Sequence, residues 1–412
     1  MHLWELYKGK DYHIVPTLER IEKAVSHLGI KPSYPSIQVG GTNGKGSTCA
    51  FLHEILKEHG YKVGWFVSPH LQEERERWRI DGELIPDEEL ARYVRELKPY
   101  FERFELTYFE ACTLIALLYF EDKGVDFAVF EVGMGGRWDA TKVCNPEVCV
   151  ITNIQRDHIR WLGSDCESRA VEKLGIYRRG KPLVLGSMRF PLYTKALELC
   201  DIKDLSVAGI DFFCSGSVRG FKTWLEFYED DRIRLEEVRL GLWGKYQADN
   251  ASLAIRSAGY LIKLEEDKVK RALERTRWEG RMELLREKPL LILDGAHNPD
   301  GIRRAVKELK THVGNITPVF TALKDKEWEL SLSYLRELSD RLYLVRLKHH
   351  RGEDISRVYK KALELGFRDV HILDEAEAVL YLEEDLVVLG SLYLLGEVRK
   401  AFFDRHEGKV YR

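Results

Sequence analysis

The chain has 412 residues, more than one hydrophobic core usually serves, so two domains are expected. Its 64 Lys and Arg residues nearly balance 67 Asp and Glu residues, and the net charge of −3 gives no general attraction to nucleic acid or anionic lipid. Seven cysteines without zinc-ligand spacing favour reduced thiols. The N-terminus lacks a signal-peptide pattern and the apolar runs are too short to cross a bilayer, so we expect a cytoplasmic, soluble monomer.

A glycine-rich loop, G-T-N-G-K-G-S at 41–47, joins a predicted buried strand at 36–40 to a predicted helix at 47–59. Its glycines let backbone N–H groups converge on an anion, Lys45 supplies a point charge, and Ser47 can offer a hydroxyl to Mg²⁺. The loop departs from the general P-loop spacing, so a plain strand-to-helix turn is the alternative. The chemistry of the loop favours a nucleotide phosphate site.

Polar residues follow three further buried strands of the first half of the chain. Because the carboxyl ends of parallel strands form the ligand-binding edge of such a sheet, these residues are expected beside the glycine-rich loop. Each has a structural alternative when taken alone, such as a Ser-Pro turn or a capping pair. The strands lie at 63–67, 126–130 and 148–154, and the residues after them are Ser68, Glu131, Asp157 and His158; Glu131 is a good candidate for a Mg²⁺ ligand.

Other stretches of the first half fit helices, hairpins and a loop. Residues 72–85 are charged and irregular, and we expect a mobile loop over the site, with a solvated surface excursion as the alternative. Helices are predicted at 86–103 and 107–123, and one long helix at 244–276. At 211–242 the apolar period switches to two, which predicts antiparallel hairpins appended to the first sheet.

Strands and helices alternate again in the last third of the chain. This alternation predicts an α/β fold of two doubly wound domains. We expect an N-terminal P-loop ATPase domain at 1–280, which carries the antiparallel strands, and a smaller C-terminal Rossmann-like domain at 281–412. The strands of the second domain are predicted at 289–293, 318–323, 341–347, 370–373 and 386–389.

Taken together, the motifs resemble those of the folylpolyglutamate synthase / dihydrofolate synthase family, within the Mur ligase superfamily. The resemblance covers the chain from about residue 15 to about residue 400. It rests on G-T-N-G-K-G-S at 41–47, S-P-H-L at 68–71, E-R-x-R-I-D-G at 76–82, E-V-G-M-G-G-R-W-D-A-T at 131–141, D-H with L-G at 157–163, E-K-L-G-I at 172–176, W-E-G-R-M-E at 278–283, D-G-A-H-N-P at 294–299 and G-S-L-Y at 390–393.

The resemblance implies an ATP-dependent ligase that adds L-glutamate to folates, and to dihydropteroate as well, through an acyl phosphate, with ADP and phosphate released. It implies ATP contacts from Thr42, Asn43, Gly44, Lys45, Gly46, Ser47, Asn250, Arg281, Asp294 and His297. Two Mg²⁺ ions, with a monovalent cation as a further option, are implied at Ser47, Ser68, Glu131, His158 and a carbamylated Lys173. Catalytic roles are implied for Lys45, Lys173, His158 and Arg281, and folate or dihydropteroate contacts for Thr107, Phe109, Glu110, Trp138, Asp139 and Ala140.

Several points stay open at this stage. Without the resemblance, Lys173 is better explained as part of a surface salt-bridge face on a helix that begins near Asp165. Tyr246 replaces a histidine of the family pattern before Asn250, and Lys142 replaces an asparagine after D-A-T, where it either approaches substrate carboxylates or points to solvent. Rival functions are another Mur-type amino-acid ligase and, from a different class, a P-loop ATPase switch without ligase activity.

Overall fold

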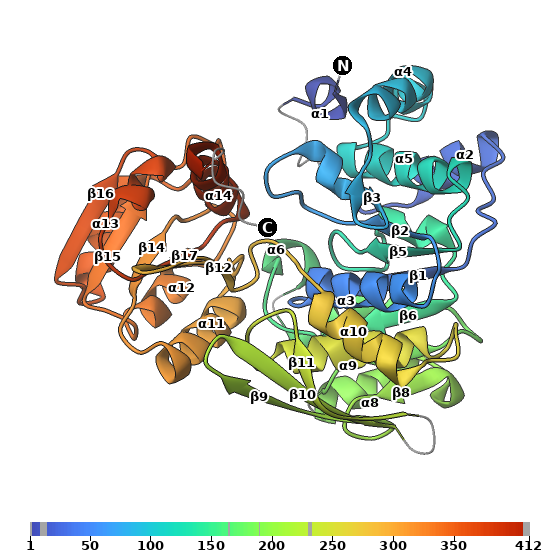
Figure 1. Cartoon of the computed structure of the whole chain (residues 1–412). Coiled ribbons are helices and arrows are strands. Elements are labelled where there is room, and N and C mark those ends of the chain that lie inside the picture. Colours follow the sequence, from blue (N-terminus) through green and yellow to red (C-terminus); the bar gives the residue numbers. More distant parts are fainter. Residues whose placement is uncertain (1, 9–14, 164, 189, 230–232, 407–412) are drawn as a thin grey trace.

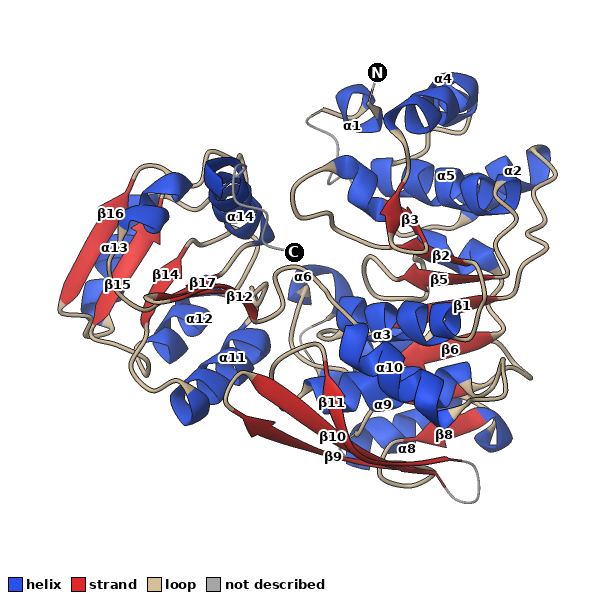
Figure 2. Cartoon of the chain, viewed as in Figure 1, coloured by secondary structure: helices blue, strands red, loops and turns tan. Residues whose placement is uncertain are grey.

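The chain folds into two α/β halves that lie side by side, with a small antiparallel sheet along one edge of both (Figures 1 and 2). The structure is a computed structural model, and it describes residues 2–8, 15–163, 165–188, 190–229 and 233–406. In the part of the chain so described, no helix is long and apolar enough to cross a membrane. The predicted α/β class with two parallel-stranded sheets is confirmed.

The first half is built on an eight-stranded sheet in the order β4-β3-β2-β5-β1-β6-β7-β8. All strands except β3 and β4 run parallel to one another. Their residues are buried on both faces of the sheet, which explains the near-continuous apolar runs in the sequence. The parallel strands are β1 (Ser36–Gly40), β2 (Val63–Phe66), β5 (Phe127–Glu131), β6 (Val148–Ile151), β7 (Leu183–Leu185) and β8 (Leu205–Val207).

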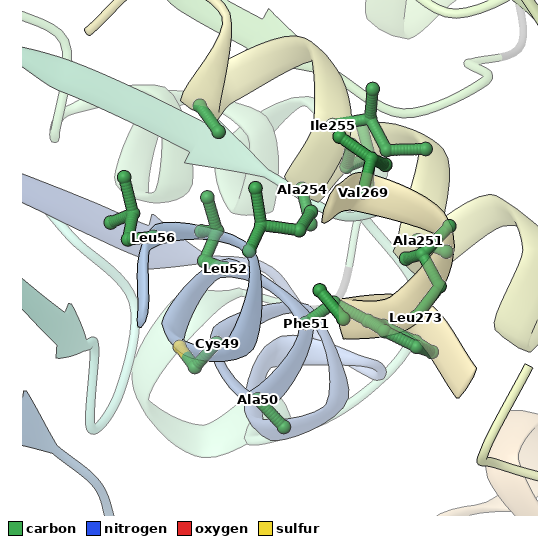
Figure 3. Close-up of a cluster of buried hydrophobic side chains, with 14 of the residues drawn as sticks. Cys49, Ala50, Phe51, Leu52, Leu56, Ala251, Ala254, Ile255, Val269 and Leu273 are labelled. Carbon is green, nitrogen blue, oxygen red and sulfur yellow. The ribbon is translucent and has the colours of Figure 1, made fainter. Parts of the chain in front are cut away.

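Helices cover both faces of this sheet because successive strand residues point to opposite sides. In β5, Val129 points into one buried cluster while Ala128 and Phe130 point into the other. Figure 3 shows the first cluster, where side chains of three helices interleave, among them Phe51 and Leu273. The helices of this face are α3 (Lys45–Glu58), α9 (Gln247–Ala258) and α10 (Glu266–Arg275); those of the other are α2 (Glu19–His27), α4 (Asp87–Arg103) and α5 (Tyr108–Asp122).

The predicted long helix at 244–276 is wrong. The segment forms two helices, because α9 ends at Ala258, with Gly259 as its C-cap, and α10 begins at Glu266. The break lets α9 and α10 both lie on α3 (Figure 3). The predicted antiparallel strands are present as β9 (Phe213–Arg219), β10 (Lys222–Glu229) and β11 (Ile233–Leu240), and they form a sheet of their own. That sheet joins the first half through buried side chains rather than through strand hydrogen bonds.

The expectation of a mobile loop or solvated excursion at 72–85 is also wrong. The segment forms a short turn, η1 (Glu74–Arg77), and a hairpin of β3 (Trp78–Ile80) and β4 (Glu83–Leu84) at the sheet edge. Trp78 is fully buried and donates its indole N–H to the Cys112 carbonyl at 3.0 Å. Glu74 accepts hydrogen bonds from the Leu3 backbone and the Tyr108 hydroxyl, at 3.1 and 2.8 Å. Partners distant in sequence therefore bury charges that look solvated in the local sequence.

The second half is a six-stranded sheet in the order β12-β13-β17-β14-β15-β16. All five strands predicted there are found and run parallel to one another; β12 (Glu283–Glu287) is an additional antiparallel edge strand that the sequence analysis missed. The parallel strands are β13 (Leu290–Leu293), β14 (Thr317–Phe320), β15 (Arg341–Val345), β16 (Asp369–Leu373) and β17 (Leu386–Leu389), and the helices α11 (Pro299–His312), α12 (Trp328–Leu335), α13 (Ile355–Glu364) and α14 (Leu392–His406).

Candidate active site

The phosphate loop, residues 41–47, leaves the end of β1 and runs directly into α3. Gly41 and Gly44 have φ values of +133° and +88°, a backbone region that favours glycine. Side chains also crowd these positions: a Cβ on Gly41 would lie 1.9 Å from Thr152 Oγ1, and one on Gly44 would lie 2.3 Å from Asn250 Oδ1. The N-terminal turn of α3 thus presents backbone N–H groups beside Lys45, an arrangement suited to phosphate.

The loop is held by the residues that follow β6. The Thr42 and Asn43 backbone N–H groups donate to the carbonyl and the side-chain oxygen of Asn153, both at 3.0 Å. Thr152 Oγ1 donates to the Asn43 carbonyl at 2.7 Å. These bonds fix the shape of the phosphate loop without occupying the N–H groups at the start of α3.

Ser68 and Glu131 meet beside the loop, as their places at the ends of β2 and β5 predicted. The Ser68 backbone N–H donates to Glu131 Oε2 at 3.4 Å. Glu131 is only 5% exposed, and burial raises its pKa while the nearby Lys45 and Arg281 charges lower it. A carboxylate buried with so few hydrogen bonds fits a divalent cation better than a purely structural role.

Lys173 is 3% exposed, so its explanation as part of a surface salt-bridge face is wrong. It lies near the end of α7 (Cys166–Leu174), whose first turn is capped by Asp165, and its ammonium donates to the Gly41 carbonyl at 3.0 Å. Burial, with the Lys45 charge adding to it, lowers the pKa of Lys173 to about 7. The amine is therefore neutral for a substantial fraction of the time near neutral pH.

Asp157 and His158 follow β6 and face the second half of the chain. Burial and the Lys326 ammonium lower the pKa of His158 to about 3, which leaves the imidazole neutral and able to donate a lone pair to a metal. Asp157 Oδ1 accepts a hydrogen bond from Lys326 Nζ at 2.7 Å, and its Oδ2 accepts one from Asn298 Nδ2 at 3.2 Å. Both donors come from the second half.

An amide pair connects the phosphate loop to the second half. Asn43 Nδ2 donates to Asn298 Oδ1 at 3.2 Å, and Asn298 Nδ2 donates to Asn43 Oδ1 at 3.0 Å. Asn298 is also the N-cap of α11, where its side chain accepts the Gly301 N–H. The two amides satisfy each other only when both halves are docked.

The nucleotide residues predicted from the resemblance gather around this loop. Asn250 lies against Gly44 and donates to Gln247 Oε1 at 2.8 Å. Burial raises the pKa of Asp294, which the Arg281 charge opposes, and Asp294 accepts backbone N–H groups of Met282 and Ala296 at 2.9 and 3.0 Å. His297 Nε2 lies 3.8 Å from Asp157 Oδ2.

Among the residues that the resemblance assigns to the folate site, some form hydrogen bonds or ion pairs through their side chains and the others have apolar or aromatic side chains. Glu110 closes a capping box with Thr107 at the start of α5 and pairs with Arg20 at 3.1 Å, and Asp139 accepts the N–H groups of Met134 and Thr141 at 3.0 Å. The Phe109 ring lies against Gly133, Ala140 is buried, and the Trp138 side chain is 43% exposed.

The two departures from the family pattern have clear positions. Lys142 does not point to solvent, because its ammonium donates to the Gly175 carbonyl at 2.7 Å, two residues after Lys173. Tyr246 is the N-cap residue of α9 and packs against the buried cluster of the second half. The sequence analysis included the motif at 294–299, but it did not identify Asn298 or Lys326 as side chains that contact the other half.

Within the described residues, no three His, Cys, Asp or Glu side chains gather as a ready-made metal site. The ligand set predicted from the resemblance contains only two residues of these types, Glu131 and His158. Hydroxyl groups, a modified lysine and the nucleotide itself would have to complete the coordination.

Comparison with known proteins agrees with this geometry. Residues 39–181 match the Mur ligase middle domain, and residues 280–392 match the Mur ligase, glutamate ligase domain. The two matched domains and the fold are thus those of a Mur-type ligase. The chain is 33% identical to the dihydrofolate synthase/folylpolyglutamate synthase of Bacillus subtilis strain 168, over 94% of this chain and 95% of that protein. It belongs to the dihydrofolate synthase/folylpolyglutamate synthase family.

Solved structures of similar proteins hold ligands. Escherichia coli FolC in complex with DHPP and ADP is 30% identical and has a TM-score of 0.87, with 98% of this chain and 97% of that chain covered. A bifunctional folylpolyglutamate synthase/dihydrofolate synthase with Mn, AMPPNP and L-glutamate bound is 29% identical and has a TM-score of 0.85, with 98% of each chain covered.

Proposed function

We propose that this protein is an ATP-dependent ligase that adds L-glutamate both to folates and to dihydropteroate. The observation that carries the proposal is the arrangement around the phosphate loop, where Lys173 reaches the Gly41 carbonyl and Asn298 reaches Asn43 from the other half of the chain. The substrate class rests on similarity along the full chain to the Bacillus subtilis enzyme, which favours a folate ligase over other Mur-type ligases and over an ATPase switch.

The residues at the strand ends fit divalent cations. Glu131 offers a buried carboxylate and His158 a neutral imidazole, while Ser47 and Ser68 each carry a hydroxyl group that could complete the ligand set. Mg²⁺ ions held there would neutralise charge on the phosphates of ATP. The relatives' bound Mn, ADP and AMPPNP support ATP and a divalent cation as requirements of this chain.

Lys173 is suited to carbamylation. Addition of CO₂ to an amine needs the neutral form, and a pKa of about 7 supplies it near neutral pH, where an ordinary lysine remains protonated. The carbamate would replace a buried cation by an anionic oxygen ligand beside the phosphate loop.

The reaction needs a leaving group, because a carboxylate does not condense with an amine at neutral pH. The γ-phosphoryl group passes to the substrate carboxylate, ADP departs, and the glutamate amine attacks the acyl phosphate to form the amide and release phosphate. Lys45 and Arg281, whose charges both act on Glu131, would stabilise the transferred group. Their positions in different halves require docking of the halves for catalysis.

We place the domain boundary at 280/281 and the nucleotide between the two domains. The start of the second Mur ligase match at residue 280 and the polar contacts across the interface support this placement. The folate pocket is assigned to Thr107, Phe109, Glu110 and Trp138 to Ala140, with Glu110 and Asp139 shaping it through backbone and ion-pair contacts.

A paired ligation assay tests the proposal. Purified protein, ATP, Mg²⁺ and L-glutamate are incubated with dihydropteroate in one tube and tetrahydrofolate in the other, and products are identified by mass. Addition of glutamate in both tubes is the expected result, and addition in one assigns a single activity. ADP release without product in either tube would refute a folate ligase.

A further inference from the structure

Lys326 is a buried cation that belongs to the second half of the chain and reaches the first. Its side chain is 5% exposed, and its ammonium lies 2.7 Å from Asp157 Oδ1, whose side chain is 9% exposed. The same ammonium lies 3.3 Å from His158 Nε2. Lys326 follows β14 in the second half, whereas Asp157 and His158 follow β6 in the first. The ion pair therefore crosses the interface between the halves.

The environment of Asp157 makes this pair different from the other ion pairs on the interface. Asn298 donates to its second oxygen at 3.2 Å, so donors from the second half contact both carboxylate oxygens. A neighbouring interface pair, Arg156 with Glu327, has side chains that are 53% and 32% exposed. The exposed pair is already open to solvent, whereas the pair between Lys326 and Asp157 is enclosed when the halves are docked, so loss of one partner in the docked protein leaves the other charge buried without it.

We propose that Lys326 is a positioning residue for the ligation reaction. Its ion pair with Asp157 fixes the segment that follows β6, and with it His158, against the phosphate loop only when the second half is docked. The cation thereby links docking of the halves to assembly of the catalytic groups. This inference rests on the proposed function for its reaction, but the ion pair and its effect on docking can be measured without the folate substrate.

Three variants and one control test the proposal: Lys326→Met, Asp157→Asn, the double variant, and Glu327→Gln, which removes only the exposed pair. We expect Lys326→Met to lower kcat about 100-fold, because misplacement of catalytic groups by about 1 Å has effects of that size. KM for tetrahydrofolate stays near the wild-type value, since the folate residues do not contact Lys326. The double variant is no slower than the slower single variant, and Glu327→Gln behaves as wild type.

A second measurement reports docking itself. Small-angle scattering of each protein, with and without AMPPNP and Mg²⁺, gives the contraction that nucleotide induces. The wild type and Glu327→Gln are expected to contract fully, and Lys326→Met and Asp157→Asn to contract less.

A wild-type kcat and a full contraction in Lys326→Met would overturn the proposal. If Lys326→Met does not fold, Asp157→Asn decides in the same way, because it removes the pair from the other side. Failure of the wild type to add glutamate would refute the proposed function alone, since the scattering comparison would still test Lys326.

Discussion

Replacement of Lys173 by methionine should make the protein more stable and less active at once. Its pKa falls from 10.5 to about 7 in the folded chain, chiefly through burial. At 1.36 kcal/mol per pKa unit, the difference of about 3.5 units means that the buried ammonium destabilises the fold by about 5 kcal/mol below pH 7. Methionine keeps the length of the side chain and removes the charge.

The sign of the pH dependence follows from proton binding. Between pH 7 and pH 10.5 the unfolded chain holds a proton on Lys173 that the folded chain has released, so stability rises with pH across this window. Below pH 7 the full destabilisation of the fold by the buried ammonium is present, and above pH 10.5 this destabilisation disappears. The gain from Lys173→Met is therefore about 4 kcal/mol at pH 6, after about 1 kcal/mol is deducted for the lost hydrogen bond to Gly41, and about 1 kcal/mol at pH 9.

The assay is urea unfolding at pH 6 and pH 9 in buffer freed of CO₂, together with glutamate addition in the presence of bicarbonate. Lys31→Met, at an exposed lysine, is the control and should change neither quantity. We expect Lys173→Met to lose most turnover. Equal or lower stability than wild type at pH 6 would refute the burial argument, and unchanged turnover would remove Lys173 from the mechanism.

Three further substitutions test separate parts of the structure. Gly44→Ala should abolish binding of a fluorescent ATP analogue, because the new Cβ would lie 2.3 Å from Asn250 Oδ1 at a φ of +88°. Trp78→Ala should lower the free energy of unfolding by about 3–5 kcal/mol, measured by urea unfolding, since the indole is fully buried. Arg20→Ala leaves the Glu110 carboxylate without its ion pair, and KM for dihydropteroate should rise while KM for ATP stays unchanged.

For each of these three predictions one result would contradict the reasoning. Gly60→Ala is the matched control for Gly44→Ala, because Gly60 has a φ of +93° but no atom lies within 4 Å of an added Cβ. Equal nucleotide affinity in the two variants would rule out the clash with Asn250. A loss below about 1 kcal/mol in Trp78→Ala would mean that the hairpin is not part of the core. Equal changes in both KM values in Arg20→Ala would indicate a general loss of structure.

The sequence predicted the parallel strands well because their signal is local. The run at 386–389 is apolar throughout, and the run at 36–40 is fully buried although it contains Ser36 and Gln38. Each is followed by turn residues, so the position and type of these strands could be predicted without knowledge of their partners. The same pattern predicted the ligand-binding edge of the sheet. Glu131 is the last residue of β5 and Ser68 lies two residues after β2, whereas His158 lies seven residues after β6.

The errors arose where contacts between distant residues decide the structure. The hairpin at 72–85 is charged in sequence, yet Leu3 and Tyr108 supply the partners that bury Glu74. The break between α9 and α10 depends on how both helices fit α3, and no proline marks it. Lys326 and Asn298 could not be distinguished from solvated polar residues, because their partners are more than 140 positions away.

The interface between the two halves has an apolar side and a polar side. At the antiparallel sheet, Trp243 lies in one buried apolar cluster with Ile302 and Met282 of the second half, with Val218 packed against it. Beside the phosphate loop, the contacts are amides and charges, as between Asn43 and Asn298 (Figure 1 shows the small sheet near α11). Water can replace polar contacts but not apolar ones. Separation at the polar side, with the apolar side still in contact, would therefore expose the least apolar surface, and we expect the halves to open beside the phosphate loop first.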